Sequence, residues 1–134
     1  MKYFFSDGFN NILENAEIEM KNLKHPYVGT EHLLLAFLKA DDDDYIVNLL
    51  NDIGLNYYSF KQTLLKFFGV GNIHYDFILY TPLLRNIIDN SICYSDDNFI
   101  NEKDLFFSFC FSEDGVAKSI LKIMGIDIRK TLKL

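Results

Sequence analysis

Two hydroxyl residues, Ser6 and Thr81, are the side chains of this sequence best suited to bind an anion. Each precedes a stretch with helical periodicity, so each is expected to cap a helix with its side-chain oxygen. Such a hydroxyl and the free backbone N–H groups of a first helical turn together form a cradle for phosphate or carboxylate. Capping alone would also explain both residues, because a cap contributes about 1 kcal/mol without any ligand.

A carboxylate in the predicted first turn of another helix, Glu31, could accept hydrogen bonds from a guanidinium. Thr30 before it is expected to cap a strongly apolar helix running from Glu31 to about Ala40. A favourable interaction with the helix dipole would explain Glu31 equally well without a ligand. The corresponding position later in the chain is Lys103, which would repel a guanidinium.

No catalytic residue, metal ligand set or cofactor motif is predicted. There is no GxxxxGK[ST] loop for nucleotide phosphates and no nucleophile elbow. Cys93 and Cys110 lack metal-ligand spacing and are expected to be buried free thiols in a reducing compartment. The acidic run Asp41–Asp44 lacks the spacing of an EF-hand and is expected to be a solvated loop. The three histidines also lack ligand spacing: His25, His32 and His74. His32 is expected to be packed against other side chains.

The elements that must position these residues occur twice, because residues 5–55 and 80–127 are two copies of one helical unit. Three blocks recur in the same order, and the offsets between them change only at the joints between helices. The paired blocks are 11–16 with 86–91, 33–37 with 105–109, and 49–56 with 120–127.

The fold class predicted from this duplication is all-α, with about eight helices in two pseudo-symmetric four-helix repeats and no sheet. One compact domain, 1–134, is expected to contain repeat one at about 5–68, a connector at about 69–79 and repeat two at about 80–132. The expected helices after the first run at about 31–40, 45–53, 57–68, 82–94, 101–111 and 115–124, with a short one from Asp127.

Composition excludes several classes of partner. The net charge of −6 argues against nucleic acid and anionic membrane surfaces, which attract basic proteins. No apolar run reaches the ~20 residues of a membrane span, and the N-terminus does not have the pattern of a signal peptide. The predicted location is therefore cytoplasmic.

The string Val28-Gly29-Thr30-Glu31-His32-Leu33-Leu34-Leu35, with the capped first helix and the duplication, resembles the N-terminal domain of Clp-type AAA+ unfoldases, particularly the ClpC branch. This resemblance implies a helical module that captures substrate or adaptor proteins for an ATPase ring. Domains of the ClpC branch also recognise phosphorylated arginine at one site in each repeat. The implied site of repeat one combines Ser6 with Glu31. The site of repeat two is expected to be degenerate, with Thr81 retaining an anion cradle and Lys103 excluding phosphoarginine.

Two other functions remain open. The chain could be a stand-alone regulator that competes for the partners of an unfoldase. It could also be an enzyme or small-molecule-binding protein that uses a pocket between the repeats. Aromatic residues of the second half could line such a pocket, although helical spacing favours a core position for them: Phe99, Phe106, Phe107, Phe109 and Phe111.

Overall fold

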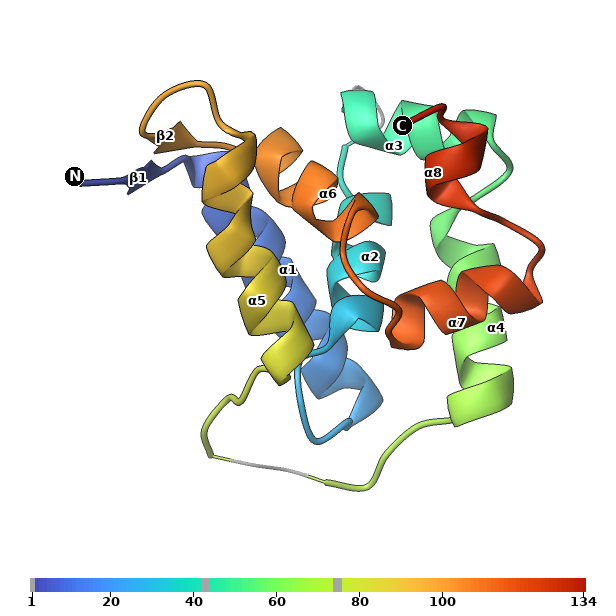
Figure 1. Cartoon of the computed structure of the whole chain (residues 1–134). Coiled ribbons are helices and arrows are strands. Elements are labelled where there is room, and N and C mark those ends of the chain that lie inside the picture. The colour runs from blue at the N-terminus through green and yellow to red at the C-terminus, as the bar shows by residue number, and fades with distance from the viewer. Residues whose placement is uncertain (1, 42–43, 74–75) are drawn as a thin grey trace.

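The computed structural model describes residues 2–41, 44–73 and 76–134, and most of these residues lie in helices (Figure 1). Four α-helices precede the connector and four follow it, so the prediction of an all-α fold built from two four-helix repeats is confirmed. In chain order the elements are β1 (Phe4–Phe5), α1 (Asp7–Leu23), α2 (Thr30–Leu38), α3 (Tyr45–Asp52), α4 (Tyr57–Phe68), α5 (Pro82–Asn90), the 3-10 helix η1 (Ser91–Tyr94), β2 (Phe99–Ile100), α6 (Glu102–Cys110), α7 (Val116–Ile123) and α8 (Ile128–Thr131).

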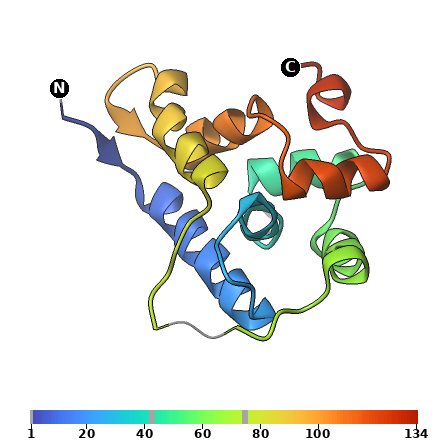
Figure 2. The same ribbon diagram turned by 60° about the horizontal axis from the view of Figure 1, so that its bottom comes forward.

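Helix α2 forms the centre of the molecule. Every residue from Leu33 to Leu38 is buried, which explains why this stretch is apolar on all sides. Figure 2 shows α2 nearly end-on, and α1, α3, α4 and α7 pack against it. Its counterpart α6 contacts α1, α5 and η1. The rings of Phe37 and Phe106 meet edge to face at 5.4 Å, so one aromatic contact joins the two repeats.

The predicted caps of the two leading helices are confirmed. The Ser6 Oγ atom accepts a hydrogen bond from the Phe9 amide at 3.0 Å, and Thr81 Oγ accepts one from the Leu84 amide at 3.2 Å. Helix α1 buries Phe9, Ile12, Ala16 and Met20, which recur at helical spacing. It ends at Leu23, and the C-cap Lys24 has a left-handed φ of 56°. Local sequence signals therefore place both helix starts correctly.

The predicted cap of α2 is wrong. Gly29 is the N-cap, and Thr30 is the first helical residue. The Thr30 hydroxyl is buried and accepts a hydrogen bond from the Ala117 amide at 3.1 Å, so it satisfies the start of α7 in the other repeat. The side-chain hydrogen bond at the start of α2 comes instead from His32, whose Nδ1 atom accepts from the Gly29 amide at 2.9 Å.

The prediction of no sheet is wrong in one detail. Strand β1, directly before α1, pairs in parallel with β2, directly before α6. A second parallel bridge joins Val28, before α2, to Tyr80, before α5. In both cases the lead-in to the first helix of one repeat pairs with the lead-in to the second helix of the other repeat. These pairings bring each leading helix start beside a helix start from the opposite repeat.

Several side chains differ from the sequence expectations. Cys110 is buried, as expected, but Cys93 is exposed because it lies on the short η1 helix at the surface. Of the five aromatic residues expected in the core, Phe106 and Phe109 are buried, whereas Phe99 is half exposed on β2. Within the acidic run, Asp44 caps α3, while Asp42 and Asp43 lie outside the described residues. His74 also lies outside them.

Candidate functional site

The start of α1 places a hydroxyl group, free backbone amides and a carboxylate side by side. The Ser6 hydroxyl donates to Glu102 Oε2 at 3.3 Å while its oxygen caps the Phe9 amide. The Glu102 carboxylate reaches over the first turn of α1, because a Cβ atom at Gly8 would collide with it. In the described part of the chain the amides of Asp7 and Gly8 have no hydrogen-bond acceptor. A negative charge is favoured at this end of a helix by the dipole.

The sequence did not single out Glu102. It is the first residue of α6, one position before Lys103, and it reaches Ser6 only because β1 pairs with β2. Each of these strands has only two residues, which is too short to produce an alternating pattern. The contact spans 96 positions of the chain, so no local signal could have predicted it.

The predicted site combining Ser6 with Glu31 is not formed. Helix α1 has 17 residues and is therefore about 25 Å long. Ser6 caps its first turn, whereas Glu31 lies near its other end, because the neighbouring His32 contacts His25 just after α1. A ligand the size of one amino acid cannot bridge these positions.

Glu31 is also poorly placed to bind a cation from solvent. Its side chain is only 13% exposed and folds over Gly29. Burial raises the pKa of its carboxyl group above the usual value. Its Oε1 atom lies 3.8 Å from His32 Nδ1, but this is not an ion pair, because Nδ1 accepts the Gly29 amide proton and the ring is neutral.

A chain of hydrogen bonds through His25 and His32 connects the end of α1 to the start of α2 and the end of α4. His25 Nε2 donates to the Gly69 carbonyl at 2.8 Å, so His25 Nδ1 is the acceptor in the 2.9 Å contact with His32 Nε2. Both rings are therefore neutral and protonated at Nε2. Burial, together with His25, lowers the pKa of His32 to about 3. His32 is packed, as expected, and each of its nitrogens has a partner.

The histidine chain should make stability depend on pH. The folded pKa of His32 is below its unfolded value, so the unfolded state binds the extra proton and stability is lost as the pH falls from about 6.5 towards 3. The expected slope is about 1.4 kcal/mol per pH unit, or about 2 kcal/mol between pH 6.5 and 5. Denaturant titrations across this range measure it.

The control for this prediction is His32→Gln, which keeps an amide donor but does not titrate. Its unfolding free energy should lack the slope that the wild type shows, whatever its stability at pH 7. The raised pKa of Glu31 acts with the opposite sign and is present in both proteins, so the difference isolates His32. Parallel pH profiles for the two proteins would contradict the prediction.

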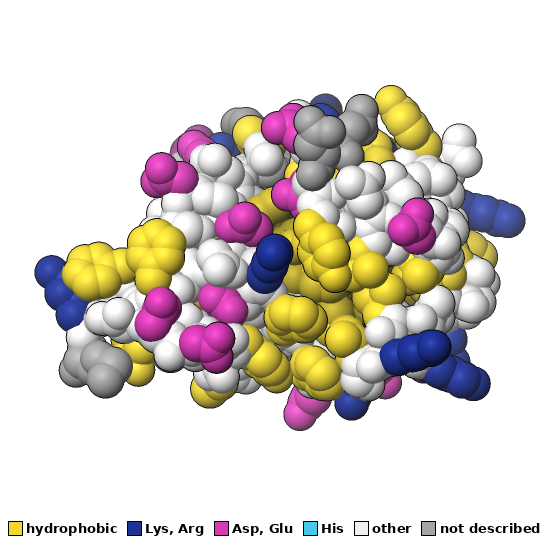
Figure 3. Space-filling model, turned by 90° about the horizontal axis from the view of Figure 1, so that it is seen from above, with side chains coloured by type: hydrophobic (Ala, Val, Ile, Leu, Met, Phe, Trp, Pro, Cys, Tyr) yellow, Lys and Arg dark blue, Asp and Glu magenta, His cyan; other side chains and the backbone are white. Residues whose placement is uncertain are grey.

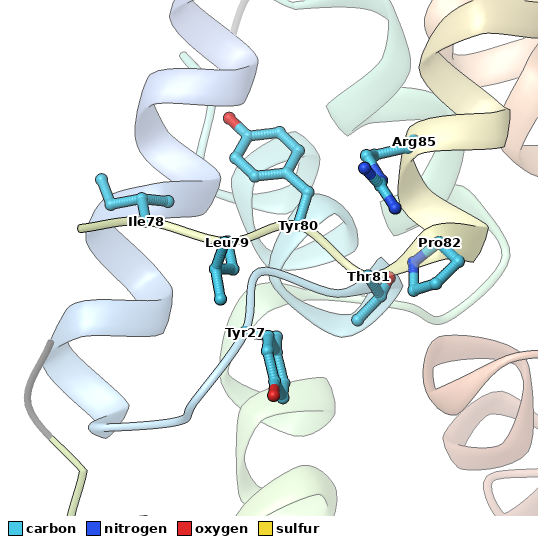
Figure 4. A pocket seen from close by; sticks show the side chains of 7 residues that line it. All are labelled: Tyr27, Ile78, Leu79, Tyr80, Thr81, Pro82 and Arg85. Atoms are coloured by element: carbon cyan, nitrogen blue, oxygen red, sulfur yellow. The ribbon is translucent and has the colours of Figure 1, made fainter.

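The start of α5 borders a cavity of about 590 Å³ at the joint between the repeats. Figure 4 shows Thr81, Pro82 and Arg85 on the helix side and Tyr27 on the facing loop. Arg85 is exposed, and no side chain in the described ranges pairs with it. We call this hollow the Thr81 cavity. Its lining residues are Tyr27, Ile78, Leu79, Tyr80, Thr81, Pro82 and Arg85.

Lys103 does not reach this cavity, so the predicted pairing of Thr81 with Lys103 in one degenerate site is wrong. Its Nζ atom lies 5.1 Å from the centre of the Tyr45 ring, over α3 of the first repeat. Lys103 instead borders a second hollow of about 120 Å³ between the repeats, on the apolar face shown in Figure 3. The other residues lining this hollow are Tyr45, Leu49, Phe106, Phe107, Leu132 and Leu134.

Within the described ranges, no group of three or more histidine, cysteine or acidic side chains is placed to hold a metal ion. No helix within the same ranges is both long and apolar enough to cross a membrane.

Comparison with known proteins identifies the relatives of this chain. Residues 4–92 match the family model described as the Clp repeat (R) N-terminal domain. A probable ATP-dependent Clp protease ATP-binding subunit from Chlamydia pneumoniae is 25% identical over 139 residues, covering 96% of this chain and 16% of the relative. ClpC from Staphylococcus aureus strain USA300 is 25% identical over 122 residues, covering 89% of this chain and 15% of that protein. The chain thus spans about a sixth of these relatives.

Two solved structures share the fold. The N-terminal domain of ClpD from Arabidopsis thaliana has a TM-score of 0.75 at 19% identity, with 97% of this chain and 95% of that domain covered. The Hsp104 N-terminal domain from Candida albicans has a TM-score of 0.71 at 17% identity, with coverage of 92% and 83%.

Proposed function

This chain belongs to the Clp repeat N-terminal domain family, and from that premise we propose that it is a non-catalytic module that captures substrate or adaptor proteins for a Clp-type ATP-dependent unfoldase. Such N-domains are commonly binding modules for substrates and adaptors. The chemistry at the start of α1 supports a binding role, because it places hydrogen-bond donors and a carboxylate acceptor together at the surface.

We further propose that the start of α1 reads phosphorylated arginine. The observation that carries this proposal is the 3.3 Å contact between Ser6 and Glu102. A phosphoarginine needs donors for its phosphate and, a few ångströms away, an acceptor for its guanidinium. The amides of Asp7 and Gly8 supply the donors, the Ser6 hydroxyl holds Glu102 beside them, and Glu102 supplies the carboxylate. In this proposal Glu102 takes the role that the family resemblance implies for Glu31.

Replacing Glu102 by alanine should weaken phosphoarginine binding by about 1.5 to 3 kcal/mol, or about 10- to 150-fold. The guanidinium loses its charged acceptor, while the cap of α1 stays intact because the Ser6–Phe9 hydrogen bond does not involve Glu102. Calorimetric titration with free phosphoarginine measures the effect, with arginine and phosphate as separate controls. The expected stoichiometry for the wild type is one ligand per chain.

Two matched variants distinguish this site from the one expected from sequence. Glu31→Ala should bind phosphoarginine as the wild type does, because Glu31 is folded inward at the far end of α1. Lys103→Glu should leave the stoichiometry at one, because Lys103 faces Tyr45 and not a cradle. Loss of binding in Glu31→Ala with full binding in Glu102→Ala would reject the assignment. An absence of binding to the wild type would reject phosphoarginine as the ligand.

A further inference from the structure

The Thr81 cavity lacks the internal carboxylate that occupies the equivalent position in the first repeat. At the start of α1 the Ser6 hydroxyl donates to Glu102, the first residue of α6. The equivalent first residue of α2 is Thr30, whose hydroxyl is engaged with the Ala117 amide. The Thr81 hydroxyl caps the Leu84 amide and donates to no acceptor in the part of the chain that the structure describes. A donor that is satisfied internally in one repeat is therefore open in the other.

Arg85 adds a positive charge beside this open donor. It lies four residues after Thr81 on α5, so both side chains belong to the same face of the helix. Arg85 lines the cavity, and the described residues provide no acceptor for its guanidinium. In a chain of net charge −6, an unpaired arginine in a cavity wall attracts an anion from outside the chain.

The remaining walls of the cavity are apolar and uncovered. Tyr27 is 46% exposed and Leu79 is 42% exposed. The Tyr80 hydroxyl points away from the cavity towards α1 (Figure 4), where burial and the Glu17 carboxylate raise the pKa of Tyr80 to about 12. Tyr80 therefore contributes its ring. The Thr81 cavity combines donors for one carboxylate with apolar surface for one side chain.

We propose that the Thr81 cavity binds the C-terminal residue of a partner polypeptide that ends in an aromatic or large aliphatic side chain. The terminal carboxylate accepts hydrogen bonds from Arg85 and Thr81, and the side chain packs against Tyr27 and Leu79. A C-terminal residue carries both groups on one Cα atom, which suits donors and apolar walls confined to one cavity. The proposal does not depend on phosphoarginine binding at α1, which uses a separate helix start.

The test is an NMR titration of the ¹⁵N-labelled full chain with three short peptides. The probes are Ac-Ala-Phe with a free carboxylate, Ac-Ala-Phe-NH2, and Ac-Asp-Phe-NH2, in which the negative charge is internal. The free acid should shift the amide signals of Tyr27, Thr81 and Arg85, and the two amides should bind at least tenfold more weakly. Equal binding of all three peptides, or shifts confined to other surfaces, would overturn the proposal. Equal binding of the internal acid and the free acid would overturn the assignment to a C-terminus.

Variants separate the charge from the apolar walls. Arg85→Gln should weaken binding of the free acid about tenfold or more, and Tyr27→Ala should weaken both Ac-Ala-Phe and its amide. The matched control is Arg129→Gln, which removes the same charge from an arginine that lies over the Phe111 ring instead. The spectra of each variant without peptide show whether it is folded. Unchanged affinity in Arg85→Gln, with its fold intact, would overturn the proposal.

Discussion

Replacing Phe37 by alanine should lower the free energy of unfolding by about 3 to 5 kcal/mol, the largest effect expected of any single change here. Phe37 is 1% exposed on the central helix α2, and its ring packs edge to face on Phe106 of the second repeat. Truncation removes the favourable free energy of transferring the ring out of water. It also leaves a cavity between the two repeats, because the helices of each repeat keep their positions. Guanidinium denaturation followed by circular dichroism measures the loss.

The matched control for this substitution is Phe67→Ala. Phe67 lies on α4 and is 53% exposed, so the same chemical change there should alter stability by less than about 1 kcal/mol. Similar losses in the two variants would show that the Phe37–Phe106 contact is not central to the core. A change in the slope of the denaturation curve for Phe37→Ala would indicate that the two repeats no longer unfold together.

Replacing Glu19 by alanine should cost about 3 kcal/mol, because it breaks a buried polar network. Glu19 is 1% exposed on α1 and accepts the Tyr57 hydroxyl of α4 at 2.7 and 2.9 Å. Lys39 Nζ lies 3.7 Å from its carboxylate, and Lys61 Nζ donates to the Tyr57 hydroxyl at 3.1 Å. Without Glu19 the Tyr57 hydroxyl loses its acceptor and Lys39 loses its carboxylate partner. Thermal and denaturant unfolding measure the effect.

A double-mutant cycle shows whether these groups act together. Tyr57→Phe should also destabilise, because it leaves the buried carboxylate without its neutral donor, and the double variant should lose less than the sum of the single losses. Glu14→Ala on the exposed face of α1 is the control and should change stability by no more than about 0.5 kcal/mol. Additive losses would mean that Glu19 and Tyr57 do not stabilise each other.

The sequence predicts those features that depend on neighbouring residues. The apolar period of α1, the caps at Ser6 and Thr81 and the fully apolar helix α2 are all local patterns, and the structure has each of them. The repeats could be aligned because the blocks keep their order, so Lys103 does correspond to Glu31, each being the second residue of its helix.

The candidate sites could not be predicted in this way, because their members come from different repeats. Each predicted site lay within one repeat, whereas the pairing of β1 with β2 brings Ser6 to Glu102 of the other repeat. Thr30 has the composition of a cap, but tertiary contact directs its hydroxyl to Ala117. Side-chain direction also mattered, since Lys103 and Glu102 are adjacent in sequence but contact different helices.

The crossed pairing of helix lead-ins has a consequence for how the two halves depend on each other. Each half supplies the strand residue that the other half needs, as two subunits do in a domain-swapped dimer, but here one chain contains both partners. A fragment ending before the connector would keep Ser6 but lose Glu102, and would leave the outer edge of β1 without its ladder. The two halves are therefore not separable modules. A substitution in one half can therefore change the candidate site at a helix start of the other half.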